Sequence, residues 1–226
     1  MLNRKNMSDN IDIEDQRHFI EKTTRYIKEE LYEAEGGHDW YHIRRVWKNA
    51  VYIAKKEGRG DLFVIELAAL LHDIADAKFH NGDETLGPRL AEEFLKSINV
   101  PEEVIDHVIK IIENISFRKR HHTKTLDSIE LQIVQDADRL DAIGAIGIAR
   151  VFNFGGFMNR PIYEYSGNGN ANNNTQNRHT IGHFYDKLLL LSGMMNTQTA
   201  KAMAAERHEF MVRFLEQFYK EWEVPE

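Results

Sequence analysis

The chain contains no cysteine, and this absence removes several classes of site at once. Disulfide bridges, thiolate metal sites and catalysis by a cysteine nucleophile are all excluded. A structural zinc site is disfavoured for the same reason, because such sites are built mainly on cysteine thiolates. A protein without cysteine fits a reducing compartment, so we expect a cytoplasmic location.

Long apolar segments are also missing. No run of residues is long enough to span a bilayer, and residues 1–6 lead into polar residues without the apolar core of a signal peptide. The 36 acidic residues outnumber the 29 basic ones and give a net charge of −7. Because a nucleic-acid backbone favours a basic partner, this balance argues against one. We therefore expect neither a membrane nor a nucleic acid as partner.

The remaining composition predicts an all-α protein. A chain of 226 residues, 42% of them hydrophobic, can form one sizeable core but is short for two ordinary domains. Apolar residues recur at helical spacing, and no convincing strand pair is found. We interpret residues 1–10 as a flexible tail and 11–226 as a single-domain helical bundle with an Asn-rich loop at about 166–177. The expected helices cover 11–35, 40–57, 62–76, 84–98, 102–116, 128–152, 181–195 and 197–222. Gly144 and Gly147, inside one of them, are taken as close helix contacts and not as a break.

The most informative stretch is the apolar run 62–71, which ends abruptly at His72 and Asp73. A helix without a polar face is typically buried, and a buried charge is costly unless it is paired or binds a metal. Neighbouring residues of a helix differ by about 100° around its axis, so His72 and Asp73 can converge only on something lodged between them. A divalent cation would satisfy both side chains, and its other ligands must come from elsewhere in the chain.

Two further residues complete a candidate metal constellation. His42 lies on the predicted helix 40–57, and Asp138 lies on the helix 128–152. Two imidazoles and two carboxylates suit manganese, iron, magnesium, cobalt or zinc and leave coordination positions open for a water and a substrate oxygen. Alternatively, His42 is a hydrogen-bonded structural residue and Asp138 pairs with Arg139 or another neighbour.

The segments 38–46, 70–78 and 136–144 resemble the H…HD…D signature of the HD-domain metal-dependent phosphohydrolases, in particular the stand-alone bacterial branch. The resemblance covers 37–222. It implies an all-helical bundle of the HD-domain type and a metal site formed by His42, His72, Asp73 and Asp138. The family pattern selects Asp138 in preference to Asp136. The additional histidines of two-metal members are not clearly matched by Asn114, His107 or His121–His122. We therefore expect one divalent ion, manganese first, with Mg²⁺, Fe²⁺, Co²⁺, Ni²⁺ or Zn²⁺ as alternatives.

Catalytic roles follow from the needs of phosphoryl transfer, which depends on positioning and charge stabilisation. Asp73 can orient the attacking water. Asp76 is either a base or a supporting group for a ligand, or a plain surface residue. Arg45 and Lys78 are the first choices for neutralising phosphate charge. Weaker candidates for that role are the basic loop 118–122, Arg178, His183, Lys187 and Arg207.

Members of the branch that this chain resembles include nucleoside-triphosphate pyrophosphohydrolases. The resemblance therefore implies hydrolysis of (deoxy)nucleoside triphosphates to the monophosphate and pyrophosphate. A phosphatase or phosphodiesterase acting on another phosphorylated small molecule is the nearer alternative. A regulatory module that binds nucleotide without turnover is a more distant one. We expect a monomer or a homodimer.

Overall fold

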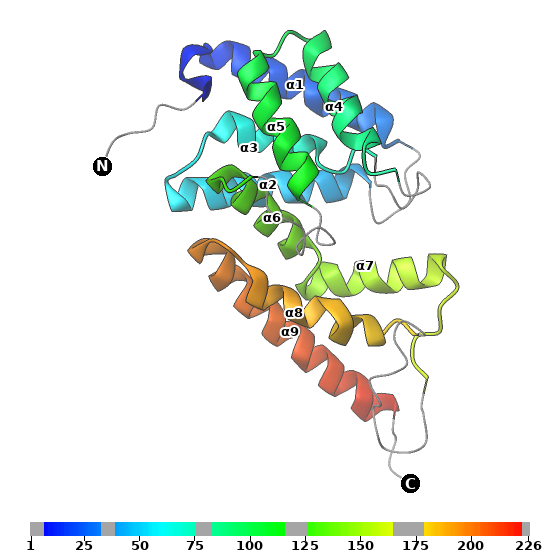
Figure 1. The fold of residues 1–226 in the computed structure, drawn as a ribbon. Helices are drawn as coiled ribbons and strands as arrows, with labels where there is room; N and C mark the ends of the chain where they lie inside the picture. The colour runs from blue at the N-terminus through cyan, green and yellow to red at the C-terminus, as the bar shows by residue number, and fades with distance from the viewer. Residues whose placement is uncertain (1–6, 33–38, 76–82, 116–125, 165–178, 223–226) are drawn as a thin grey trace. The chain divides into compact units, whose positions relative to one another are not determined.

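The structure, a computed structural model, describes residues 7–32, 39–75, 83–115, 126–164 and 179–222 (Figure 1). Secondary structure in these ranges is entirely helical and contains no strand, which confirms the all-α prediction. Contacts between residues divide the chain into two compact units, Met1–Ala137 and Asp138–Glu226. The first unit contains η1 (Met7–Asn10), α1 (Ile13–Glu30), α2 (Trp40–Glu57), α3 (Leu62–Leu71), α4 (Leu86–Ser97) and α5 (Glu102–Asn114). The division falls within α6 (Ile129–Asp141), and the second unit continues with α7 (Gly144–Phe157), η4 (Phe184–Leu188), α8 (Leu189–Leu191), η5 (Ser192–Met194) and α9 (Gln198–Trp222).

Helix α3 forms the centre of the first unit and packs against α1, α2 and α5. Apart from half-buried Leu62 and Glu66, all of its residues are buried, as its composition predicts. Asp61 caps the helix, because its carboxylate accepts hydrogen bonds from the amides of Phe63 and Val64. Among the described residues, no single helix is both long and apolar enough to cross a membrane; α6 and α7 satisfy that criterion only as a bent pair.

The helix predicted over 62–76 ends earlier than expected. It stops at Leu71, and the described residues that follow, 72–75, form a turn in which the amide of Ile74 donates to the carbonyl of Leu71. His72 and Asp73 therefore lie just beyond the end of α3. There the 100° rotation between neighbouring helical residues no longer fixes the directions of their side chains.

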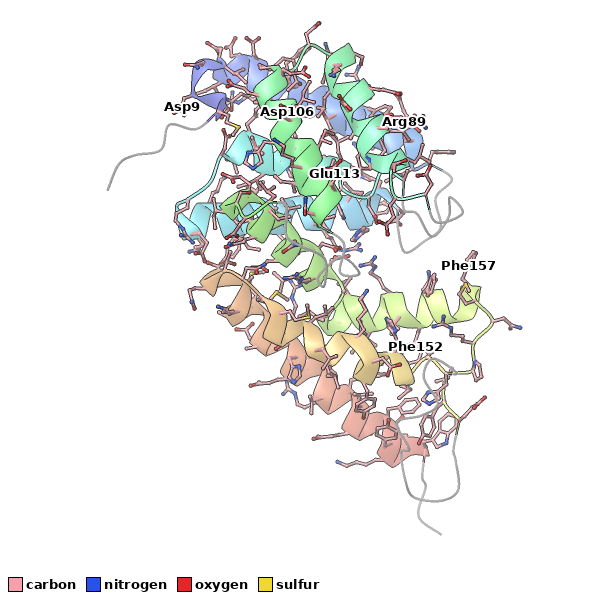
Figure 2. All side chains as sticks on the ribbon, viewed as in Figure 1. Asp9, Arg89, Asp106, Glu113, Phe152 and Phe157 are labelled. Atoms are coloured by element: carbon pink, nitrogen blue, oxygen red, sulfur yellow. The ribbon has the colours of Figure 1, made fainter. Side chains whose placement is uncertain are left out.

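Helix α5 covers α3 with an apolar face on which Val104, Val108 and Ile111 are buried. Its opposite face is exposed and mostly acidic, and it carries Asp106 and Glu113, which are labelled in Figure 2. This separation of apolar and charged faces is the pattern expected of a helix on the outside of a core.

In the second unit, α7 packs against α9. Phe152 of α7, labelled in Figure 2, lies 6.2 Å from Phe184 and 6.0 Å from Phe214, measured between ring centroids. The segment expected as one helix over 181–195 instead contains the π-helical turns of η4, the short α8 and the 3-10 turn η5. Residues 165–178, which hold most of the predicted Asn-rich loop, lie outside the described residues.

The prediction of one continuous helix over 128–152 is wrong. The chain leaves the helical path after Asp141, and α7 begins at Gly144. Gly144 has φ +76°, a left-handed conformation that other residues rarely adopt, so it starts a new helix and does not continue the old one. Gly147 makes a close approach, but to the carbonyl group of Ala142 in the turn that precedes α7 and not to a residue of another helix.

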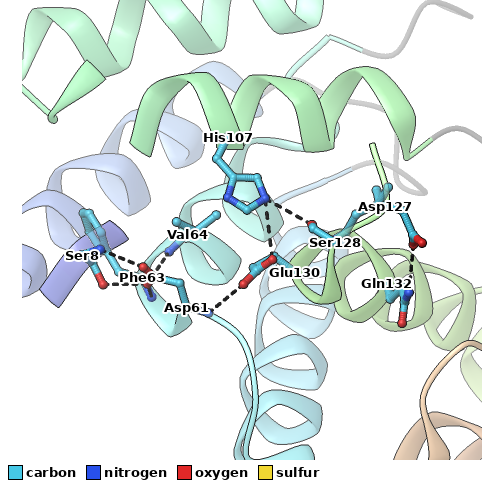
Figure 3. A network of polar contacts seen from close by, with 10 residues as sticks. Ser8, Asp61, Phe63, Val64, His107, Asp127, Ser128, Glu130 and Gln132 are labelled. Carbon is cyan, nitrogen blue, oxygen red and sulfur yellow. Dashed lines mark hydrogen bonds and ion pairs between the residues drawn. The ribbon is translucent and has the colours of Figure 1, made fainter. Parts of the chain in front are cut away.

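A buried polar network anchors residues that the sequence assigned to a flexible tail (Figure 3). Residues 7–10 form η1, and Ser8 donates to Asp61 through its amide at 2.8 Å and its hydroxyl at 2.7 Å. The amide of Asp61 in turn donates to Glu130, which lies 3.6 Å from the imidazole of His107. Residues 1–6 lie outside the described part of the chain. The network therefore joins η1, α3, α5 and α6 within the first unit.

Replacing Asp61 by alanine is expected to lower the free energy of unfolding by about 2–4 kcal/mol, because it removes a helix cap and leaves buried donors of Ser8 without an acceptor. Ser8→Ala is the matched control. It keeps the cap and the amide hydrogen bond, so a loss of about 1 kcal/mol is expected. Urea denaturation followed by far-UV circular dichroism measures both, and equal losses would contradict the central position of Asp61.

Candidate metal centre

His42 lies in the first turn of α2, and the local sequence explains its position. Asp39 caps the helix, and its carboxylate accepts a hydrogen bond from the amide of His42 at 3.0 Å. The His42 side chain is almost completely buried, with 1% of its surface exposed. The Asp39 cap thus fixes the turn that holds the imidazole inside the first unit.

His72 follows the last residue of α3, and its ring is oriented by the backbone. Its Nδ1 atom lies 2.9 Å from the carbonyl oxygen of Ala69. A carbonyl oxygen can only accept, so this contact places a ring proton on Nδ1 and leaves the buried Nε2 as the nitrogen through which the ring can bind a metal. Histidines that bind metal commonly donate their other ring N–H to a backbone carbonyl in this way.

The side chains of His42, His72 and Asp73 converge. One potential ligand atom from each lies within 4.8 Å of the others, and among the residues that the structure describes this is the one such set of three. His42 Nε2 is 3.8 Å from Asp73 Oδ2, and the two imidazole centroids are 5.4 Å apart. Ligands of an ion with bonds of about 2.1 Å lie roughly 3–4 Å from one another. The spacing therefore fits a shared divalent cation.

The donor set restricts the chemistry of this centre. Two imidazole nitrogens and one carboxylate oxygen suit divalent first-row ions and leave coordination positions available. Asp73 is the more accessible member of its pair with His42, because 19% of its side chain is exposed compared with 1% for His42.

A side-chain hydrogen bond also joins α2 to α3. The indole of Trp47 donates a hydrogen bond to Glu66 at 3.0 Å. Burial raises the pKa of Glu66, while the Trp47 hydrogen bond and the charge of Lys55 act in the opposite direction. Sequence reasoning overlooked this pair. Its signal was Glu66 itself, a charged residue within the apolar run 62–71.

The other predicted residues have different outcomes. Arg45 is half-buried on α2, three residues after His42. Asp76 and Lys78 lie outside the described residues. Asp138 is half-buried on α6 and is the first residue of the second unit, so its part in the metal site stays a prediction.

His107, considered as a ligand for a second metal, has another environment. Its Nε2 atom lies 3.1 Å from the hydroxyl of Ser128 and 3.6 Å from the carboxylate of Glu130 (Figure 3). These contacts place it in the network that joins α5 to α6. The basic loop 118–122 and Arg178 lie outside the described residues, and Arg207 contacts the end of α6.

The chain is similar to known proteins over most of its length. A model of the HD domain matches residues 39–143, a range that includes His42, His72, Asp73 and Asp138. The Bacillus subtilis protein YpgQ is 41% identical over 89% of this chain and 92% of its own length.

Solved structures agree with this relationship. An HD-superfamily hydrolase from Bacillus thuringiensis has 43% identity and a TM-score of 0.74, and the alignment covers 93% of this chain and 100% of that one. The structure of Bacillus subtilis YpgQ in complex with ADP has 38% identity and a TM-score of 0.75, with 91% and 96% of the two chains covered. The fold of the HD type that the sequence predicted is thereby confirmed.

Proposed function

Because this chain belongs to the HD-domain family of hydrolases, we propose that it is a metal-dependent phosphohydrolase that converts (deoxy)nucleoside triphosphates to the monophosphate and pyrophosphate. The observation that carries the proposal is the convergence of His42, His72 and Asp73. Asp138 is the proposed fourth ligand, and Mn²⁺ is the proposed ion. A cytoplasmic enzyme, monomeric or homodimeric, with no nucleic acid or membrane as partner, completes the proposal.

A bound divalent ion would supply two effects, polarisation of a phosphoryl oxygen and a lower pKa of a water molecule. The protein side chains would hold the ion, orient the attacking water and neutralise the charge of the phosphates. His72, oriented through Ala69, and the capped His42 provide ligand nitrogens that need no rearrangement. Asp73 can accept a hydrogen bond from the attacking water. We assign the neutralisation of phosphate charge to Arg45 and Lys78, and the support of the water or a ligand to Asp76.

Nucleotides are the preferred substrate class because a relative with 38% identity, YpgQ, was crystallised in complex with ADP. A bound diphosphate does not distinguish release of pyrophosphate from release of orthophosphate. A phosphatase or phosphodiesterase acting on another phosphorylated small molecule is therefore the second candidate. A module that binds nucleotide without turnover is less well supported, since an open metal coordination site has no evident use there.

Product analysis distinguishes these activities. We expect the Mn²⁺-loaded protein, given a nucleoside triphosphate, to release the monophosphate and pyrophosphate, resolved by anion-exchange chromatography. Asp73→Ala and Asp138→Ala should both abolish this release. Formation of orthophosphate, or cleavage only of a generic phosphomonoester, would instead support the second candidate. Undiminished activity of both variants would show that the proposed metal site is wrong.

A further inference from the structure

The last turn of α6 carries Asp138, and its end is held by an arginine from a distant helix. The last carbonyl groups of any α-helix lack partners within the helix. Here the carbonyl oxygen of Leu140 accepts a long hydrogen bond, 3.4 Å, from the amide of Ile143 in the turn that follows, and a second one from Nη1 of Arg207, which lies on α9 and is 67 residues away in sequence. Arg207 thus closes the helix two residues beyond the proposed metal ligand.

The aliphatic part of Arg207 also lies against the turn that follows α6. A Cβ atom at Gly144 would lie 2.9 Å from Cγ and 3.0 Å from Cβ of Arg207. Only glycine leaves room for the arginine stem there, and the φ of +76° at Gly144 favours glycine as well. The same residue therefore permits both the break after α6 and the approach of Arg207.

Two further arginine contacts hold this turn within the second unit. Arg139 donates to the carbonyl oxygen of Met194 at 2.6 Å, and Arg150 donates to the buried carboxylate of Asp141 at 2.9 Å. Burial lowers the pKa of Arg207, while the charge of Asp141 raises it. Cations near the carboxyl end of a helix also interact favourably with its dipole. Each of the three residues that follow Asp138, namely Arg139, Leu140 and Asp141, therefore takes part in a hydrogen bond that involves a guanidinium group.

We propose that Arg207 is a positioning residue for Asp138, a role that rests on the proposed function of Asp138 as a metal ligand. By closing the last turn of α6, Arg207 prevents fraying of the backbone that carries the carboxylate. This role differs from the phosphate binding suggested by the sequence, because the guanidinium of Arg207 donates to Leu140 and its stem packs on Gly144, which holds the side chain at the helix end. Removing a group that orients a metal ligand typically weakens metal affinity 10- to 100-fold, and we expect an effect of this size for Arg207.

The test compares Mn²⁺ affinities by isothermal titration of the full chain. Arg207→Met should weaken binding about 10- to 100-fold. Arg207→Lys, which keeps a charged donor, should retain part of the affinity. Arg213→Met removes an exposed arginine of the same helix and should bind like wild type. Asp138→Ala is included to establish that Asp138 is a ligand.

The outcomes separate this inference from the proposed function. If Asp138→Ala weakens binding and Arg207→Met does not, the positioning role is refuted and the metal site stands. If Asp138→Ala binds Mn²⁺ like wild type, the proposed ligand is wrong and the inference falls with it. Hydrogen exchange of the amides of 138–141 in Arg207→Lys provides a second reading, should Arg207→Met fail to fold. Faster exchange there than in Arg213→Met supports the role, and equal exchange overturns it.

Discussion

Replacing Asp73 by asparagine is expected to reduce turnover by the Mn²⁺-loaded protein about 10³-fold. The substitution keeps the shape of the side chain but removes the negative charge that faces His42 Nε2 at 3.8 Å. A bound metal contributes several kcal/mol of transition-state stabilisation, and about 4 kcal/mol corresponds to a factor of 10³. Initial rates at saturating nucleoside triphosphate, with Mn²⁺ in excess, measure the effect.

The same variant should lose the stabilisation that the ion gives to the folded state. A ligand present at about 100 times its Kd stabilises the protein that binds it by about 2.7 kcal/mol. Thermal denaturation with and without Mn²⁺ should therefore show a shift for wild type and little or none for Asp73→Asn. Asp106→Asn is the matched control, because Asp106 is an exposed carboxylate on the outer face of α5 (Figure 2). A full Mn²⁺ shift in Asp73→Asn would show that this carboxylate is not a ligand.

The second large effect is expected at Gly147, where alanine should lower the free energy of unfolding by about 3 kcal/mol. A Cβ atom at this position would overlap the backbone carbonyl of Ala142. Backbone cannot move aside as a flexible side chain can, so the turn between α6 and α7 would have to shift. Urea denaturation monitored by circular dichroism at 222 nm gives the difference from wild type.

Gly156 provides the control on the same helix. A Cβ atom there meets nothing within 4 Å, and the residue is helical and exposed. Gly156→Ala should therefore stabilise the protein by about 0.5–1 kcal/mol, the usual gain from replacing glycine in a helix. The same substitution thus has opposite signs at two positions of α7. Similar losses at both would indicate that helix propensity and not the contact with Ala142 governs this helix.

The sequence by itself determined the features that depend on neighbouring residues. The apolar run 62–71 predicted a buried helix, and α3 is buried. Asp39 and Asp61 directly precede two of the predicted helices, and both accept hydrogen bonds from the first turn of the helix that follows. Periodicity and capping are local, because they involve residues within a turn or two of each other. The family signature likewise identified His42, His72 and Asp73 before their convergence was seen.

Only the tertiary structure decided where those elements end and what holds them. The sequence did not predict the turn after Leu71, the helix break before Gly144 or the hydrogen bond between Ser8 and Asp61. Each depends on residues far apart in the chain or on backbone conformation. Ser8 meets Asp61 across 53 positions, and Arg207 meets Leu140 across 67. A hydrogen bond between residues so far apart in sequence forms only after packing has brought the helices together. The residue pattern of one segment therefore cannot predict it.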